Sequence, residues 1–162
     1  MIASKKLLIF GGIALSIFGM LYGLHYAIFI EHQTLDQVGN SLTSAFSHAA
    51  EGRWEASESA LLNYSQSRYK YVRQVDVHSH WIGLAMLMIV LGCAFDRVGF
   101  SERVRRGLAM AMLAGSVTFP LGVILQTLSH NALWGSALAV VGSAGVTVAL
   151  AAMAWGFARA TS

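Results

Sequence analysis

The chain has few charged residues, one cysteine and one proline. Charged side chains make up 12% of the 162 residues, whereas soluble domains carry about a quarter. The single cysteine, Cys93, excludes an internal disulfide and a cysteine-rich zinc site. A Cys-x-x-Cys-His motif is absent, so covalent c-type haem is unsupported. The chain also lacks a phosphate-binding loop and a His-Glu-x-x-His motif, the signatures of many nucleotide-binding proteins and zinc proteases.

Hydrophobic residues are abundant instead. They form 56% of the chain, and the mean hydropathy is +0.57. A chain of this length accommodates one domain. Three uncharged runs are long enough to cross a hydrocarbon core of about 30 Å as helices. These runs cover residues 7–30, 107–128 and 133–158.

A fourth predicted span has a shorter apolar core. Its clean run, residues 81–95, would form a helix of only about 22 Å. A helix that crosses the bilayer must therefore begin several residues earlier. This places Asp76, His78 and His80 in the edge of the membrane and not in a free loop.

The distribution of cationic residues predicts the orientation. One side of the predicted bundle carries seven Lys and Arg in short segments, and the other carries four, spread over nearly fifty residues with six of the eight acids. The dense cationic side is expected to be cytoplasmic, with both termini inside and residues 31–77 and 129–132 outside. The basic pI of about 9.3 follows from this distribution and does not indicate nucleic-acid binding. The seven residues are Lys5, Lys6, Arg97, Arg103, Arg105, Arg106 and Arg159.

The segment between the first two spans contains no proline and is predicted to be helical. Residues 51–53, Glu-Gly-Arg, mark a break, and apolar residues from Trp54 onward recur at roughly helical spacing. We expect an outer helical segment of about 33–75 whose second half runs straight into the second span.

These patterns predict an all-α membrane protein with one domain, residues 1–162. It is a four-transmembrane-helix bundle, N-in/C-in, multi-pass in the bacterial inner (cytoplasmic) membrane. The membrane helices are expected at about 6–31, 76–96, 105–129 and 132–158.

All six histidines fall on the predicted outer side. Four of them lie at or inside the predicted membrane boundary, on three different helices, and an ionisable residue at that depth indicates function. These four are His25, His78, His80 and His130. His32 is a further candidate ligand near the interface, whereas His48 is expected to be solvated.

Helix geometry limits how these side chains can combine. His78 and His80 are about 200° apart on a regular helix, so only one of them can face a given centre; which one faces the bundle stays open. Asp76 lies one turn before His80 and can hold its ring through the second nitrogen. Polar groups able to bind haem propionates or a quinone head group are also close to the predicted outer end. They are Tyr22, Tyr26, Gln126 and Thr127.

Several chemistries fit such a histidine set. Two imidazoles from different helices can bind haem iron axially. Three or four imidazoles suit copper, zinc or iron, with His25, His32, His78, His80 and His130 as the ligands. Neutral histidines with Asp76 can also relay protons near a quinone.

One short run of the sequence resembles a motif of known membrane haem proteins. It extends from Asp76 to Met86 and reads Asp-Val-His-Ser-His-Trp-Ile-Gly-Leu-Ala-Met. It resembles the His-x-His start of a transmembrane helix in haem-copper oxidase and nitric oxide reductase catalytic subunits. It is more similar still to small four-helix membrane haem proteins related to them. The resemblance implies that a histidine of this motif binds a b-type haem near the outer side. This chain has four predicted spans where those enzymes have twelve or more, so the resemblance implies haem binding without implying catalysis.

The resulting hypothesis is a haem b membrane protein for electron transfer or redox sensing at the outer leaflet. His25 and either His78 or His80 are the expected axial ligands, with His130 as a substitute. The expected partners, besides the lipid bilayer, are quinol and a periplasmic or membrane redox protein. The hypothesis also allows the chain to form a homo-oligomer. One alternative is a copper-binding protein that takes up metal at the periplasmic face. Another is a non-catalytic subunit of a respiratory or transport complex that docks through the outer helices.

Overall fold

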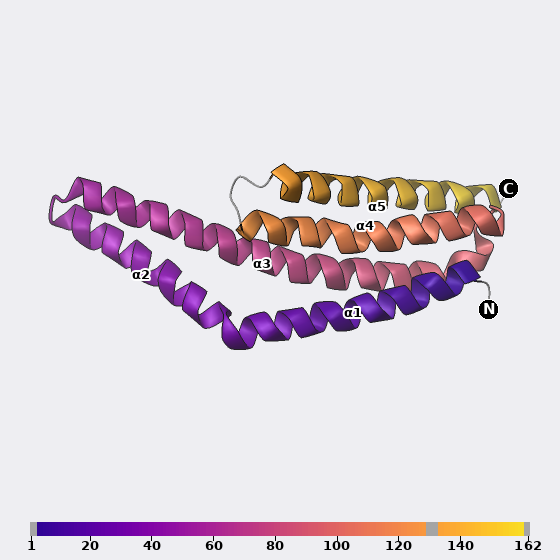
Figure 1. Ribbon diagram of the computed structural model, residues 1–162, viewed down its shortest axis with the longest axis horizontal. Coiled ribbons are helices and arrows are strands. Elements are labelled where there is room, and N and C mark those ends of the chain that lie inside the picture. The colour runs from indigo at the N-terminus through magenta and orange to yellow at the C-terminus, as the bar shows by residue number, and fades with distance from the viewer. Residues whose placement is uncertain (1–2, 129–132, 161–162) are drawn as a thin grey trace. The chain divides into compact units, whose positions relative to one another are not determined.

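A computed structural model of the chain describes residues 3–128 and 133–160. The described residues form five α-helices and one short 3₁₀ helix, with no strand among them (Figure 1). The α-helices are α1 (Ala3–Phe29), α2 (Glu31–Ala50), α3 (Trp54–Ala94), α4 (Glu102–Leu128) and α5 (Leu133–Ala160), and the 3₁₀ helix η1 covers Phe95–Arg97.

Four of these helices are long and apolar enough to cross a membrane: α1, α3 together with η1, α4 and α5. The all-helical class and the four candidate spans predicted from the sequence are therefore confirmed. As predicted, α3 is one helix of 41 residues that continues from the outer segment into the second span. The predicted break before it is also confirmed, because Gly52 has a φ of 71°, a left-handed conformation that glycine adopts without strain.

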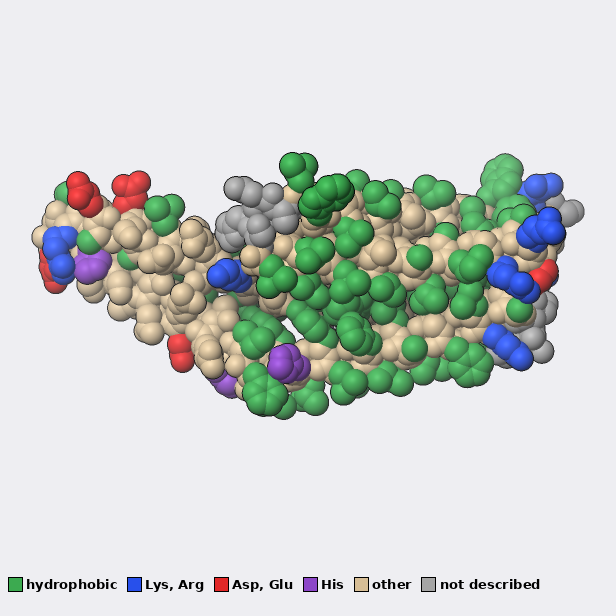
Figure 2. Space-filling model, in the orientation of Figure 1, with side chains coloured by type: hydrophobic (Ala, Val, Ile, Leu, Met, Phe, Trp, Pro, Cys, Tyr) green, Lys and Arg blue, Asp and Glu red, His purple; other side chains and the backbone are tan. Residues whose placement is uncertain are grey.

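The residues form two compact units, which are described separately. The first unit comprises Met1–Leu21 and Val77–Ser162. In it, α4 lies between α3 and α5 (Figure 1). Hydrophobic side chains cover the visible face of its helices between their ends (Figure 2). Apolar side chains directed outward over such a length are what a lipid environment requires.

Glycines let the helices of the first unit approach closely. A Cβ added to Gly142 of α5 would lie 2.5 Å from the backbone nitrogen of Phe119 in α4. A Cβ added to Gly12 of α1 would lie 2.8 Å from the carbonyl oxygen of Ala85 in α3. Neither position therefore accommodates a larger residue without moving a backbone. Small residues at such crossings are typical of membrane helices.

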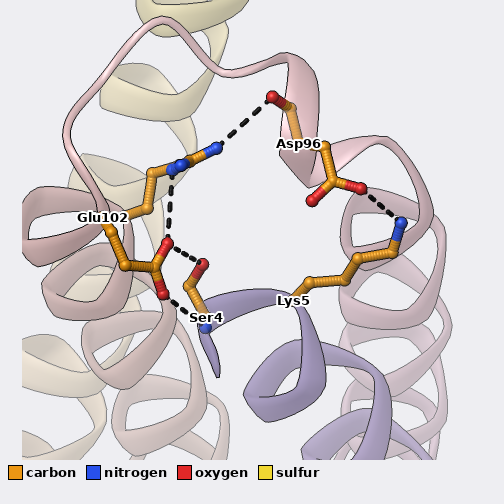
Figure 3. Close-up of polar contacts among 5 residues, drawn as sticks. Ser4, Lys5, Asp96 and Glu102 are labelled. Carbon is orange, nitrogen blue, oxygen red and sulfur yellow. Dashed lines mark hydrogen bonds and ion pairs between the residues drawn. The ribbon is translucent and has the colours of Figure 1, made fainter. Parts of the chain in front are cut away.

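Polar contacts join the helices at the cationic end of this unit, where α1 begins and α5 ends (Figures 2 and 3). The carboxylate of Glu102 accepts hydrogen bonds from the backbone N–H and the hydroxyl of Ser4, both at 2.9 Å. Lys5 pairs with Asp96, and Arg105 lies 3.5 Å from Glu102. Ser4 stands in the first turn of α1, where backbone N–H groups have no partner within the helix. Glu102 therefore caps α1 from another helix.

The second unit, Tyr22–Asp76, is a hairpin of two antiparallel helices. It contains the end of α1, all of α2 and the first half of α3. Its two long helices meet through small side chains, and the hydroxyl of Ser57 donates to the carbonyl oxygen of Ala45 at 2.9 Å. Tyr71 of α3 lies 3.5 Å from the carboxylate of Glu31 in α2. The seam of the hairpin thus combines small side chains with a few polar contacts.

Candidate functional site

His78 is the candidate ligand with the most defined surroundings. Its Nδ1 lies 2.9 Å from the backbone carbonyl oxygen of Gly19 in α1, within the first unit. A carbonyl oxygen only accepts hydrogen bonds, so Nδ1 carries the proton and donates it. In the neutral ring the lone pair is then on Nε2, the atom that remains for a metal or a proton.

Gly19 is placed so that this bond can form. A Cβ at this position would lie 3.0 Å from the Cβ of Trp81 and 3.2 Å from the Cδ1 of Ile82. The absence of a side chain lets α1 and α3 approach until the imidazole reaches the backbone. No pattern in the sequence indicated that the backbone carbonyl of Gly19 accepts a bond from His78.

His80 points to another helix. Its ring packs against the ring of Phe119 in α4, with 4.7 Å between centroids and 54° between planes, and its side chain is exposed. The predicted angular separation of the two histidines is therefore confirmed: His78 faces α1, and His80 faces α4. The sequence left open which of them turns toward α1.

The other histidines are distributed elsewhere. His25 and His32 are exposed in the second unit, and the ring of His25 lies 5.2 Å from that of Phe29. His48 is partly buried in the same unit, and its Nδ1 has no hydrogen-bond partner among the described residues. His130 lies outside the described residues.

Most predicted polar partners are engaged in local contacts. Tyr22 donates to the side-chain oxygen of Gln74, and Gln126 lies 3.4 Å from the hydroxyl of Ser136 in α5. The hydroxyl of Thr127 donates to the carbonyl oxygen of Ile124 at 2.7 Å. The first two contacts join helices and the third lies within α4, and each group would have to exchange its partner to bind a quinone or a propionate.

Two further predicted residues lie in the second unit. Tyr26 is buried, with 7% of its surface exposed. Asp76 lies 3.9 Å from Arg73, one turn earlier in the same helix; its expected role in orienting the ring of His80 stays a prediction.

A three-ligand metal site is not formed by the described residues. In residues 3–128 and 133–160, no three His, Cys, Asp or Glu side chains gather as ligands for a metal ion. Cys93 is exposed and free, without a second thiol in the sequence. The described geometry thus provides single imidazoles and no preformed cluster.

An apolar groove of about 350 Å³ lies in the first unit between α1, α3 and α4. Two of its lining residues, Gly11 and Ala14, are small and leave space beside larger walls. Trp81, which follows His80 directly, lines the same groove and packs edge-on against Phe18 at 4.8 Å. Phe18 also lines the groove, and the remaining lining residues are Leu15, Leu113, Val117 and Leu121. A flat or chain-like apolar group is the kind of ligand such a groove accommodates.

Comparisons with protein-family models, with curated proteins and with solved structures give no match.

Proposed function

We propose that the protein is a b-type haem-binding membrane protein that transfers or senses electrons. The observation that carries this proposal is the bond from His78 Nδ1 to the Gly19 carbonyl oxygen at 2.9 Å. Histidines that bind metals almost always donate their second ring N–H to a carbonyl, a carboxylate or water. His78 has this arrangement on a helix that is long and apolar enough to span a membrane.

The bond prepares His78 for ligation in two ways. It fixes the tautomer with the lone pair on Nε2, and it restrains rotation of the ring. A ligand held in place before binding loses less conformational entropy when iron binds. His78 is therefore the proposed first axial ligand. The second ligand proposed from the sequence is His25, with His130 as the substitute.

The groove beside Trp81 supports an apolar cofactor at this level of α3. Its walls carry no charged side chain, as burial of a porphyrin among apolar groups requires. Haem, when bound, supplies a one-electron couple between ferric and ferrous iron. The role of this chain is to orient the ligand, exclude water and set the polarity around the iron.

The proposed orientation places both termini in the cytoplasm and residues 31–77 outside, in a bacterial inner membrane. It is supported by the cationic end of the first unit, visible in Figure 2, because short cationic segments favour the cytoplasmic side. On this orientation His78 lies toward the outer leaflet, where quinol or a periplasmic redox protein is the proposed electron partner.

The test is spectroscopic. Protein purified from a haem-replete host should show a Soret band, α and β bands after dithionite reduction, and haem in a pyridine haemochrome assay. His78→Gly should lose haem during gel filtration, and added imidazole should restore the spectrum by replacing the missing side chain. His48→Ala, in the second unit, is the matched control and should keep a full complement of haem. Wild-type protein without a Soret band would refute the proposal.

The same sample separates the two alternatives. A copper-binding protein would contain stoichiometric copper by elemental analysis and no haem. A non-catalytic subunit of a larger complex would contain neither, and it would co-purify with other polypeptides under mild detergent extraction.

A further inference from the structure

The hairpin of the second unit has little interior of its own. The residues buried between its two long helices are small: Ala45 is 3% exposed, Ala60 8% and Ser57 8%. Small side chains bury little apolar area, and burial is the main source of stability for helices outside a membrane. The hairpin is therefore a pair of helices without a sufficient core.

Its large apolar side chains lie on the surface instead, and six of them form two stripes, one on each helix, while Leu62 and Val75 lie to the sides of the α3 stripe. On α3, Trp54 and Val72 are about five helical turns apart, and Leu61 lies between them in nearly the same direction. On α2, Leu35, Leu42 and Phe46 follow the spacing of a single helix face. Five of these residues are well exposed: Trp54 at 71%, Phe46 at 69%, Leu61 at 48%, Val72 at 44% and Leu35 at 42%.

The two stripes lie on the same face of the hairpin. Phe46 is rotated about 100° from Ala45, which faces α3. Trp54 is rotated in the same sense by about 60° from Ser57 and about 120° from Ala60, which face α2. Because the helices are antiparallel, equal rotations turn both stripes to one side. We call this side the apolar face; it contains Leu35, Leu42, Phe46, Trp54, Leu61 and Val72.

The opposite face of the hairpin is polar and uncharged where its groove lies. It holds a groove of about 380 Å³ lined by hydroxyl, amide and imidazole groups and by alanine, without a charged side chain. The groove is formed by Asn40, Ser41, Ser44, His48, Ala56, Ser59, Ala60 and Asn63. Such groups are readily hydrated, so water can cover this face. Only the apolar face lacks a cover.

We propose that a second copy of this chain covers the apolar face, so that two hairpins form an intermolecular four-helix bundle. All copies in one membrane have the same orientation, so their hairpins extend on the same side of it. A two-fold axis along the membrane normal then brings two identical faces together, the commonest arrangement of homodimers. The result has the architecture of a stable soluble bundle with a shared apolar core.

The size of the apolar face fits this partner. The 20 residues of α2 give a length of about 30 Å, and two helices side by side give a width of about 20 Å. Two such faces bury roughly 1,200 Å², the lower limit for stable protein interfaces. Glu58 and Arg68 also lie along the α3 stripe, and their aliphatic stems can cover apolar surface while their charges stay in water.

Cysteine cross-linking of the full chain in native membranes tests this proposal, in a Cys93→Ser background. Leu61→Cys lies on the apolar face, and Ser59→Cys lies on the opposite face two residues away; both positions are exposed. A disulfide requires Cα atoms within about 7 Å, and the two-fold axis sets α3 of one copy against α2 of the other. Oxidation should therefore produce a covalent dimer when a Leu61→Cys copy is co-expressed with a Leu42→Cys copy, and little or none when Ser59→Cys is co-expressed with Leu42→Cys. Equal cross-linking at both positions would overturn the proposal.

The oligomeric state provides a second measurement. Wild-type protein in lipid nanodiscs should be dimeric by single-molecule photobleaching. Leu61→Glu should increase the monomer fraction at least tenfold, and Ser59→Glu should leave it unchanged, with the same helix content for both variants by circular dichroism. A wild-type protein that is monomeric would overturn the proposal, whether its apolar face binds another polypeptide or lies on the lipid surface.

Discussion

The imidazole of His78 in α3 donates a hydrogen bond to the backbone carbonyl oxygen of Gly19 in α1, although 59 residues separate the two in the chain. The bond links two helices that are each long and apolar enough to cross a membrane. The bond requires the imidazole of His78 and also a glycine at position 19, because a Cβ at Gly19 would meet Trp81 and Ile82.

Gly19→Ala should therefore weaken the site without removing a ligand. The added Cβ would lie 3.0 Å from the Cβ of Trp81, so α3 must shift and the bond from His78 must lengthen. Loss of such an outer partner typically lowers metal affinity about 10–100-fold. Transfer of haem to apomyoglobin measures the effect as a faster loss. Gly83→Ala is the control, since a Cβ there has no neighbour within 4 Å; equal rates in both variants would contradict the expectation.

The contact between α4 and α5 should be sensitive to a single methyl group. Gly142→Ala would bring a Cβ to 2.5 Å from the backbone nitrogen of Phe119, and overpacking of this kind costs about 1–3 kcal/mol. Gly145→Ala, three residues further along α5, meets nothing within 4 Å. It should be neutral or slightly stabilising, because alanine favours helices over glycine. Thermal unfolding in detergent, followed by tryptophan fluorescence, should separate the two variants. A Gly142→Ala variant as stable as wild type would show that α4 and α5 can move apart at little cost.

The hydroxyl of Ser57 should contribute modestly to the hairpin. Ser57→Ala removes the bond to the carbonyl oxygen of Ala45 but leaves that carbonyl within its own helix, so the loss should be about 0.5–1.5 kcal/mol. Hydrogen exchange of the α2 amides should become faster, while exchange in α4 stays unchanged. Faster exchange in both helices would mean that the two units unfold together. Ser65→Ala, whose hydroxyl bonds only within its own helix, is the matched control.

The proposed orientation can be tested with two engineered cysteines. In a Cys93→Ser background, Ser59→Cys in the hairpin should react with a membrane-impermeant maleimide in intact spheroplasts. Ser101→Cys, in the connection between η1 and α4, should react only after the membrane is permeabilised. Both serines are exposed, so a difference in labelling reports the side of the membrane. The opposite pattern would place the cationic end outside.

Local patterns in the sequence determined the elements of this protein. Uncharged runs of more than twenty residues predict membrane helices, since only an internally hydrogen-bonded backbone is stable in lipid. The break before Trp54 was also predictable, because residue 52 is a glycine and glycine adopts a positive φ. Periodicity likewise predicted that one helix would continue from the outer segment into the second span. These features depend on neighbouring residues alone, so a single sequence suffices to find them.

The candidate site depended on more than local pattern. Helix periodicity separated His78 from His80 by about 200°, but the direction each one faces depends on how α3 is rotated against α1 and α4. That rotation follows from packing at Gly12 and Gly19 of α1 and at Phe119 of α4, none of which belongs to the helix that carries the two histidines. Asp76 lies near Arg73 on the same helix, and its expected pairing with His80 stays a prediction.

The sequence by itself thus determined four apolar helices, a helical hairpin between the first two of them, and a set of histidines around the ends of those helices. Only the tertiary structure decided that His78 has its Nδ1 on the Gly19 carbonyl and that the large apolar side chains of the hairpin share one uncovered face. The physical reason is that hydrophobicity and backbone conformation act along the chain. Hydrogen bonds between helices and the faces that helices present depend on rotations that only packing fixes.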